Sequence, residues 1–372
     1  MHKKRSYNME NNQSLSPDVR EVGRNCTKTV SRCNFSTTIY LVVCGIAASI
    51  ISSAITYALI AFLGQDGYVS VLENPLYYNI INWSLQVICM YIIGYPVFHS
   101  LTKHLPRRDT SDKEKLGFFK FIGIFLMVEG VMLIGSMVAN TVTDLINNLL
   151  NIEVTDTTGE FIGQTPIGIV ILVVVIIGPI FEELIFRKMY IDTIGKYSTT
   201  TAILVSSVSF ALFHGNITQI IYTFGVGLIL GWVYAKTKNI VYTIILHMLL
   251  NFFGSVPSLL VEDSINRILS TPESEWVSAL SDPTFLLDYL KVMAVSLMQY
   301  GFIFVGGIIL LIMIFGRKFK LDTSDEVKFG FFRKLRIYVF NIGTFIFVIY
   351  TVLNVLLILF LPVIEQALES LT

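Results

Sequence analysis

The sequence GIVILVVVIIGPIFEELIFR, residues 168–187, joins a long apolar run to a cluster of charges. No polar side chain occurs before Glu182, and the run then meets Glu183 and Arg187. A charge at membrane depth costs roughly a few kcal/mol, so such residues usually serve a pathway, a partner or a reaction. This stretch therefore predicts a membrane helix that carries a functional site.

Composition agrees with a membrane location for the whole chain. Of its 372 residues, 53% are hydrophobic and only 15% are charged, whereas a soluble domain carries about 25% charged residues. Lys and Arg number 27, as do Asp and Glu, so net charge points to no nucleic-acid partner. We expect an all-α, polytopic membrane helix bundle whose partners are the lipid bilayer and a membrane-associated substrate.

Hydropathy predicts about nine transmembrane spans of roughly 20 residues each. They are 38–63, 80–101, 118–140, 166–190, 199–215, 217–235, 240–260, 292–316 and 337–362. Lys and Arg concentrate in alternate connections, and the intervening ones contain only Arg267 and Lys291. By the positive-inside rule this alternation predicts a cytoplasmic N-terminus and a C-terminus outside, in the plasma membrane.

The chain divides into five regions by composition. They are a disordered cytoplasmic tail (1–34), N-terminal spans (35–165), a functional core in spans four to seven (166–260), an extracellular segment (261–290) and C-terminal spans (291–372). No cleavable signal peptide is evident in the basic tail. Four cysteines form no metal-ligand pattern.

The two adjacent glutamates have different surroundings on a helix. Glu183 and Arg187 are four residues apart, in the order that favours an ion pair, so they are predicted to anchor the end of span four. Glu182 lies about 100° around the helix and has no basic residue three or four positions away. Glu182 is therefore the predicted general base.

Two further motifs place polar side chains inside apolar stretches. His214 follows Phe210 by four residues, so its ring can pack on the aromatic face. His247 and Asn251 share one helix face, where they can form a helix–helix hydrogen bond of about 1 kcal/mol or donate to an oxyanion. Together with Glu182, these residues predict one site that activates water.

Helix lengths predict that the candidate residues lie at different depths in the membrane. Counted at about 1.5 Å per residue from the nearest turn, His214 lies deeper than Glu182 and His247. A tilt, or a break near Gly215-Asn216, would bring the three to one level.

The constellation resembles the CPBP family of intramembrane proteases, which comprises CAAX proteases and bacteriocin-processing enzymes and is also called the Abi family. The matching motifs are Glu182-Glu183-x-x-x-Arg187, Phe210-x-x-x-His214 and His247-x-x-x-Asn251. The resemblance implies endopeptidase activity, with Glu182 and both histidines essential. Glu182 would deprotonate water that His214 orients, while His247 and Asn251 stabilise the oxyanion.

Three alternatives remain open. Zinc could be held by Glu182, His214 and His247, although H-E-x-x-H is absent and Asn251 is a poor ligand; a metal-free glutamate mechanism is favoured. A transporter would relay protons through the same residues, but the inverted repeats typical of transporters are not seen. A non-catalytic immunity protein would keep the motifs for structure. Nothing in the sequence specifies a prenyl pocket.

Overall fold

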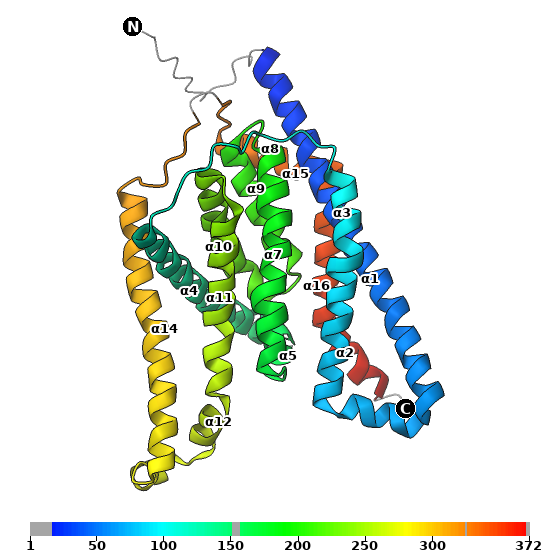
Figure 1. The fold of residues 1–372 in the computed structure, drawn as a ribbon, viewed down its shortest axis with the longest axis vertical. Helices are drawn as coiled ribbons and strands as arrows, with labels where there is room; N and C mark the ends of the chain where they lie inside the picture. Colours follow the sequence, from blue (N-terminus) through cyan, green and yellow to red (C-terminus); the bar gives the residue numbers. More distant parts are fainter. Residues whose placement is uncertain (1–16, 151–156, 324–325, 370–372) are drawn as a thin grey trace.

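The computed structural model describes residues 17–150, 157–323 and 326–369, and this part of the chain is helical without any strand. Figure 1 shows a bundle of long helices with connections at its two ends. The predicted all-α membrane bundle is confirmed. The main helices are α1 (Pro17–Glu73), α2 (Pro75–Val87), α3 (Tyr95–Thr102), α4 (Phe118–Leu150), α7 (Gly178–Glu183), α9 (Thr199–Phe213), α10 (Ile217–Thr237), α11 (Ile240–Leu260), α14 (Pro283–Phe315) and α16 (Ile342–Glu369).

Shorter elements extend or connect these helices. Three are π-helical: η1 (Ile88–Gly94), η2 (Val170–Ile177) and η3 (Leu184–Ile191). The others are α5 (Thr157–Gly163), α6 (Ile167–Ile169), α8 (Asp192–Ile194), α12 (Glu262–Ser270), η4 (Glu273–Glu275), α13 (Trp276–Ala279) and α15 (Phe331–Val339).

The number of long spans differs from the predicted nine. Seven helical segments are long and apolar enough to cross a membrane, and α15 with α16 adds an eighth if this pair, bent by 75°, is counted as one span. The predicted span 199–215 is the 15-residue helix α9, about 22 Å long against an apolar thickness of about 30 Å. It ends early because Gly215 adopts a positive φ of 60° and Asn216 caps the next helix.

The N-terminal tail also departs from the prediction. Residues 1–16 lie outside the described residues, but α1 begins at Pro17, so the expectation of disorder through residue 34 is wrong for its second half. Cys26, Cys33 and Asn34 are fully buried there. Asn34 accepts hydrogen bonds from Tyr190 and Ser209 and donates to Thr344 (2.6–2.9 Å), and these buried bonds join α1 to η3, α9 and α16.

The segment 261–290 is more helical than expected. It contains α12, η4 and α13, and α14 begins at Pro283 rather than near residue 292. Asp282 caps this early start by accepting a hydrogen bond from the N–H of Thr284 (3.0 Å). Helix α12 of this segment lies at the end of the bundle far from α8 (Figure 1).

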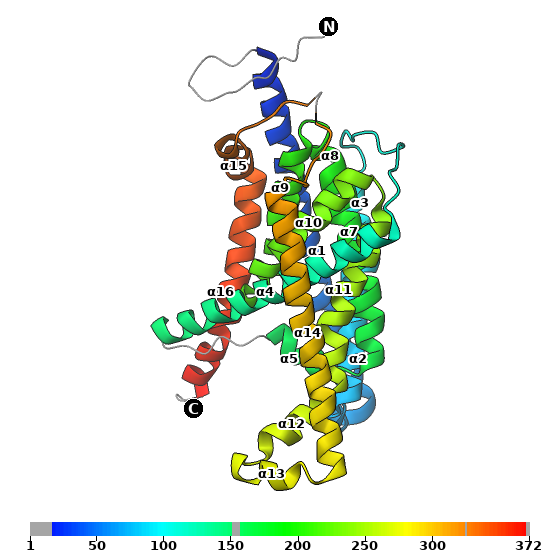
Figure 2. The same cartoon turned by 90° about the vertical axis from the view of Figure 1, so that its left-hand side faces the viewer.

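The helices of the predicted core pack closely with each other and with α4. Figure 2 shows α4 crossing the bundle obliquely. Gly227 and Gly231 of α10 lie against Ser207 and Ile203 of α9, where a Cβ would come within 3.1–3.2 Å of those residues. The hairpin of α9 and α10 is therefore tight, and its turn near Gly215 presents the C-terminal end of α9 to the neighbouring helices.

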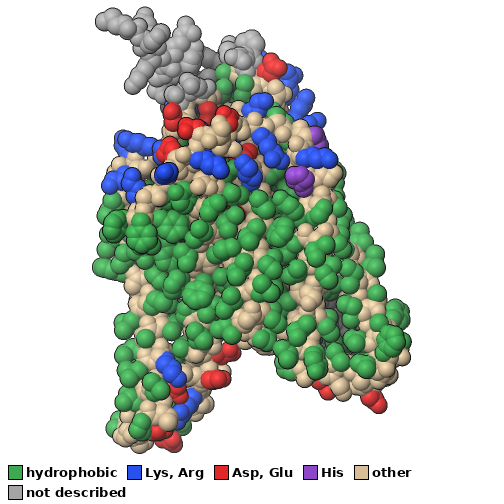
Figure 3. All heavy atoms as spheres, viewed as in Figure 1, with side chains coloured by type: hydrophobic (Ala, Val, Ile, Leu, Met, Phe, Trp, Pro, Cys, Tyr) green, Lys and Arg blue, Asp and Glu red, His purple; other side chains and the backbone are tan. Residues whose placement is uncertain are grey.

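Charged side chains occupy the two ends of the molecule. Figure 3 shows a wide band of hydrophobic side chains between a belt of Lys and Arg at one end and mostly Asp and Glu at the other. This distribution is the one expected of a chain embedded in a bilayer, and the protein is an integral membrane protein.

Candidate active site

The helix that carries the glutamates is interrupted by Pro179. The N–H of Gly178 bonds to the carbonyl of Val173, five residues earlier, as in a π-helix. Because Pro179 has no N–H, the next carbonyl, that of Val174, is left without a backbone donor. Asn251 of α11 supplies one, since its Nδ2 lies 2.8 Å from the Val174 oxygen. The amide therefore joins α11 to this helix about two turns before Glu182.

Glu183 is the centre of a buried charge network. Its Oε2 lies 3.2 Å from Nε of Arg187, and neither side chain is exposed at all. The guanidinium also stacks over the ring of Phe210, 4.7 Å from its centroid. The other carboxylate oxygen, Oε1, lies 3.0 Å from Nδ1 of His247. Glu183 thus joins the predicted ion pair to the histidine of α11.

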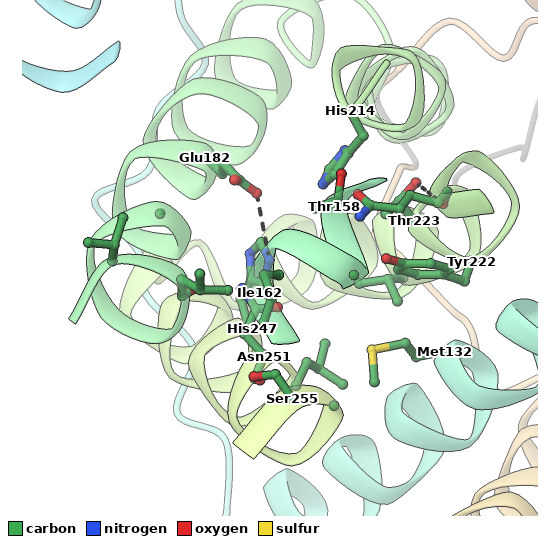
Figure 4. A pocket seen from close by; sticks show the side chains of 18 of the residues that line it. Met132, Thr158, Ile162, Glu182, His214, Tyr222, Thr223, His247, Asn251 and Ser255 are labelled. Carbon is green, nitrogen blue, oxygen red and sulfur yellow. Dashed lines mark hydrogen bonds and ion pairs between the residues drawn. The ribbon is translucent and has the colours of Figure 1, made fainter. Parts of the chain in front are cut away.

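The bond to Glu183 orients the His247 ring. A carboxylate in an ion pair can only accept, so Nδ1 of His247 carries a proton and donates it. The remaining nitrogen, Nε2, then points to Glu182, whose Oε2 is 3.7 Å away. Figure 4 shows the Glu182 side chain directed at this ring across one side of the cavity.

A hydrogen bond at Nδ1 also orients the His214 ring. Its Nδ1 lies 2.8 Å from the carbonyl oxygen of Phe210, one turn earlier. A carbonyl can only accept, so Nδ1 is the donor and Nε2 is left as an acceptor. The Phe210 ring meets both His214 and His247 edge to face, with centroids 4.7 and 5.8 Å apart. One phenylalanine thus supports both imidazoles.

The four predicted catalytic side chains line one cavity of about 770 Å³. Glu182 comes from α7, His214 from the end of α9, and His247 and Asn251 from α11, so the structure brings together residues that span 70 positions (Figure 4). The predicted break near Gly215-Asn216 is present and brings His214 to this level.

Glu182, His214 and His247 are the ligands that the zinc alternative would use. A carboxylate and two imidazole Nε2 atoms are suitable ligands in kind. In the described residues, however, no three His, Cys, Asp or Glu side chains are gathered closely enough to hold a metal ion. Glu182, His214 and His247 therefore do not fit a zinc site in this arrangement, and no catalytic step is assigned to a metal.

Two features of the site were not foreseen from the sequence. Glu183 was predicted only to anchor a helix end with Arg187, but it also binds His247. The two residues are 64 positions apart, so a local sequence pattern cannot predict their contact. For Asn251 a helix–helix hydrogen bond and donation to an oxyanion were both predicted as alternatives, but the Val174 carbonyl was not foreseen as the partner of its amide. The wall residues Met132 and Tyr222 carry no sequence signal of a site.

Comparison with known proteins identifies the segment that forms this site. Residues 164–253 match the family model described as type II CAAX prenyl endopeptidase Rce1-like. This segment belongs to the CPBP family. The predicted family resemblance is confirmed.

Relatives of the CPBP segment include two bacterial proteins. It is 35% identical over 108 residues to the membrane-embedded CAAX protease MroQ of Staphylococcus aureus (strain USA300). This alignment covers 27% of this chain and 44% of MroQ. The segment is also 36% identical over 105 residues to the UPF0177 protein YxdF of Lactococcus lactis subsp. lactis (strain IL1403), covering 27% of this chain and 58% of YxdF. The chain spans about half the length of these relatives. No solved structure matches it.

A double-mutant cycle tests the link between Asn251 and the interrupted helix. Asn251→Ala should lower the free energy of unfolding by about 1–3 kcal/mol, because the Val174 carbonyl loses its donor. In a Pro179→Ala background the new N–H can bond to that carbonyl, so the same substitution should cost measurably less. Reversible unfolding in mixed micelles gives both values.

Asn82→Ala serves as the control, since Asn82 only donates to its own helix at an exposed position. Its effect should be small and the same in both backgrounds. Strict additivity of Asn251→Ala and Pro179→Ala would contradict the assigned role of the amide.

Proposed function

We propose that the chain is an intramembrane endopeptidase that hydrolyses peptide bonds of membrane-associated peptides or proteins. The observation that carries the proposal is the placement of the Glu182 carboxylate against Nε2 of His247, in an apolar cavity that also contains His214 and Asn251. The CPBP match over residues 164–253 supports the same reaction class.

Water has two protons, and the site has two acceptors for them. Glu182 accepts one proton and removes it, while Nε2 of His214 accepts a hydrogen bond from the other and holds the oxygen in place. The resulting hydroxide adds to the carbonyl carbon of the substrate. Because Nδ1 of His214 is already bound to the Phe210 carbonyl, its ring cannot turn away from this water.

The addition puts negative charge on the carbonyl oxygen. Glu182 passes the proton that it took from water to Nε2 of His247, 3.7 Å away, so that this Nε2–H and the second N–H of Asn251 are the proposed donors to the oxyanion. The Glu183 carboxylate stabilises the positive charge that His247 then carries. His247 then returns the proton to Glu182, which passes it to the amine nitrogen, and the C–N bond breaks to give an acid and an amine.

The proposal includes an orientation and a place in the cell. We assign the end bearing Lys and Arg to the cytoplasm, with the C-terminus outside, in the plasma membrane. The belt of basic side chains in Figure 3 supports this assignment.

Substitution of each glutamate separates their roles. Glu182→Gln should reduce cleavage of a membrane-inserted peptide by at least about 10²–10⁴-fold, because it removes only the base, and should leave the melting temperature unchanged. Glu183→Gln should lower the free energy of unfolding by about 3–5 kcal/mol, because it leaves Arg187 buried without its counter-ion. Purified variants are compared by peptide cleavage and by thermal unfolding. Equal loss of activity at unchanged stability in both would show that the roles are misassigned.

Metal dependence is tested by chelation. Cleavage should persist in strong chelators, and Asn251→Ala should slow turnover by roughly 10²–10³-fold, as loss of an oxyanion donor does. The zinc alternative reverses this order: chelation would stop cleavage, while Asn251→Ala would be mild. Elemental analysis showing about one zinc per chain, lost in His214→Ala or His247→Ala, would overturn the metal-free mechanism.

A further inference from the structure

The cavity that contains Glu182 is closed at one end. At this end its lining includes the buried side chains of Phe210 (1% exposed) and Val226 (4%). Behind them Phe186 and Tyr190, both fully buried, fill the space toward the basic end of the molecule. These buried side chains separate the glutamate from the end that carries Lys and Arg.

The opposite end of the cavity reaches the surface. The lining residues that are exposed are Gly159 of α5, Gly254 of α11 and Glu262 of α12. Ser258 lies between the last two and also lines the wall. Because α12 lies at the end of the bundle far from α8 (Figure 1), the mouth opens on the face with few basic residues.

This face is electrostatically negative around the mouth. Its cations are already neutralised: Arg267 pairs with Asp282 and Asp288, and Lys291 pairs with Asp288. Hydrogen bonds from Thr284 lower the pKa of Asp282, so that carboxylate stays ionised against Arg267.

Glu262 differs from these acids. Within the described residues its carboxylate has no ion-pair partner, and it lines the mouth itself. None of the residues that line the cavity is Lys or Arg. The rim therefore offers one unpaired negative charge above an apolar interior.

We infer that the substrate enters from the face opposite the basic belt, which is the outer face of the membrane, and that it is an apolar peptide segment flanked by a cationic residue that pairs with Glu262. This inference rests on the proposed endopeptidase function and specifies its substrate class and side of entry. An apolar segment matches the cavity wall, and the flanking Lys or Arg matches the rim.

The side of entry is tested with cysteines in intact cells. Ser258→Cys, at the mouth, is treated with a charged thiol reagent that does not cross membranes, and cleavage is compared before and after treatment of the same variant. Treatment from outside should abolish cleavage, because the modified side chain blocks the mouth. The four native cysteines are buried and contribute little background.

Ser111→Cys, an exposed position at the basic end, is the matched control. It should react only after the cells are permeabilised, and its cleavage should survive. If Ser258→Cys is protected until permeabilisation while Glu182→Gln remains inactive, the side of entry is wrong and the protease function stands. If Glu182→Gln cleaves normally, the proposed function itself fails.

The charge preference is tested with two peptides that share one apolar core, flanked by Lys or by Glu. The wild type should show a several-fold lower KM for the Lys-flanked peptide. Glu262→Gln should remove that difference and Glu262→Lys should reverse it, with kcat little changed. Glu273→Gln, an exposed acid of the same segment that does not line the cavity, should keep the wild-type preference. Equal KM values for both peptides in the wild type would overturn the cationic class.

Discussion

A guanidinium with no exposed surface must have a counter-ion, and this requirement organises the site. Glu183 meets it by pairing with Arg187 at 3.2 Å, and a buried charge left unpaired would destabilise the fold by about 3–5 kcal/mol. One oxygen of the Glu183 carboxylate pairs with the arginine, and the other accepts a hydrogen bond from Nδ1 of His247. The ion pair between Glu183 and Arg187 therefore fixes how the His247 imidazole is oriented toward Glu182. The two adjacent glutamates therefore have different roles: Glu183 holds His247, and Glu182 faces the cavity.

A second constraint comes from the backbone. Pro179 removes a donor from the helix just before the glutamates, and Asn251 compensates from α11. The same side chain then has one N–H left for a developing oxyanion. Gly215 plays a comparable part in α9, because its positive φ ends the helix directly after His214. Breaks in regular helices thus bring Glu182, His214 and Asn251 to one level in the membrane.

Much of the architecture could be predicted from the sequence, and the limits have physical reasons. Apolar run lengths located the long helices, although α9 is too short to be counted among them, and residues four apart on a helix identified the Glu183–Arg187 pair, because both are local properties. The helix of residues 17–34 was missed because its burial depends on Asn34 contacting Tyr190 and Thr344, far along the chain. The Glu183–His247 bond was missed for the same reason. The cavity mouth near Glu262 depends on how the helices assemble, which no sequence periodicity reports.

The proposed mechanism depends on one feature: a bond at Nδ1 holds each imidazole, so that Nε2 of each faces the cavity beside Glu182. It is tested most directly by ¹⁵N NMR of histidine-labelled protein in lipid. The chain contains five histidines, and substitution of the other three leaves only His214 and His247 to be assigned. We expect a protonated Nδ1 in both residues. A resting state in which either ring carries its proton only on Nε2 would contradict it.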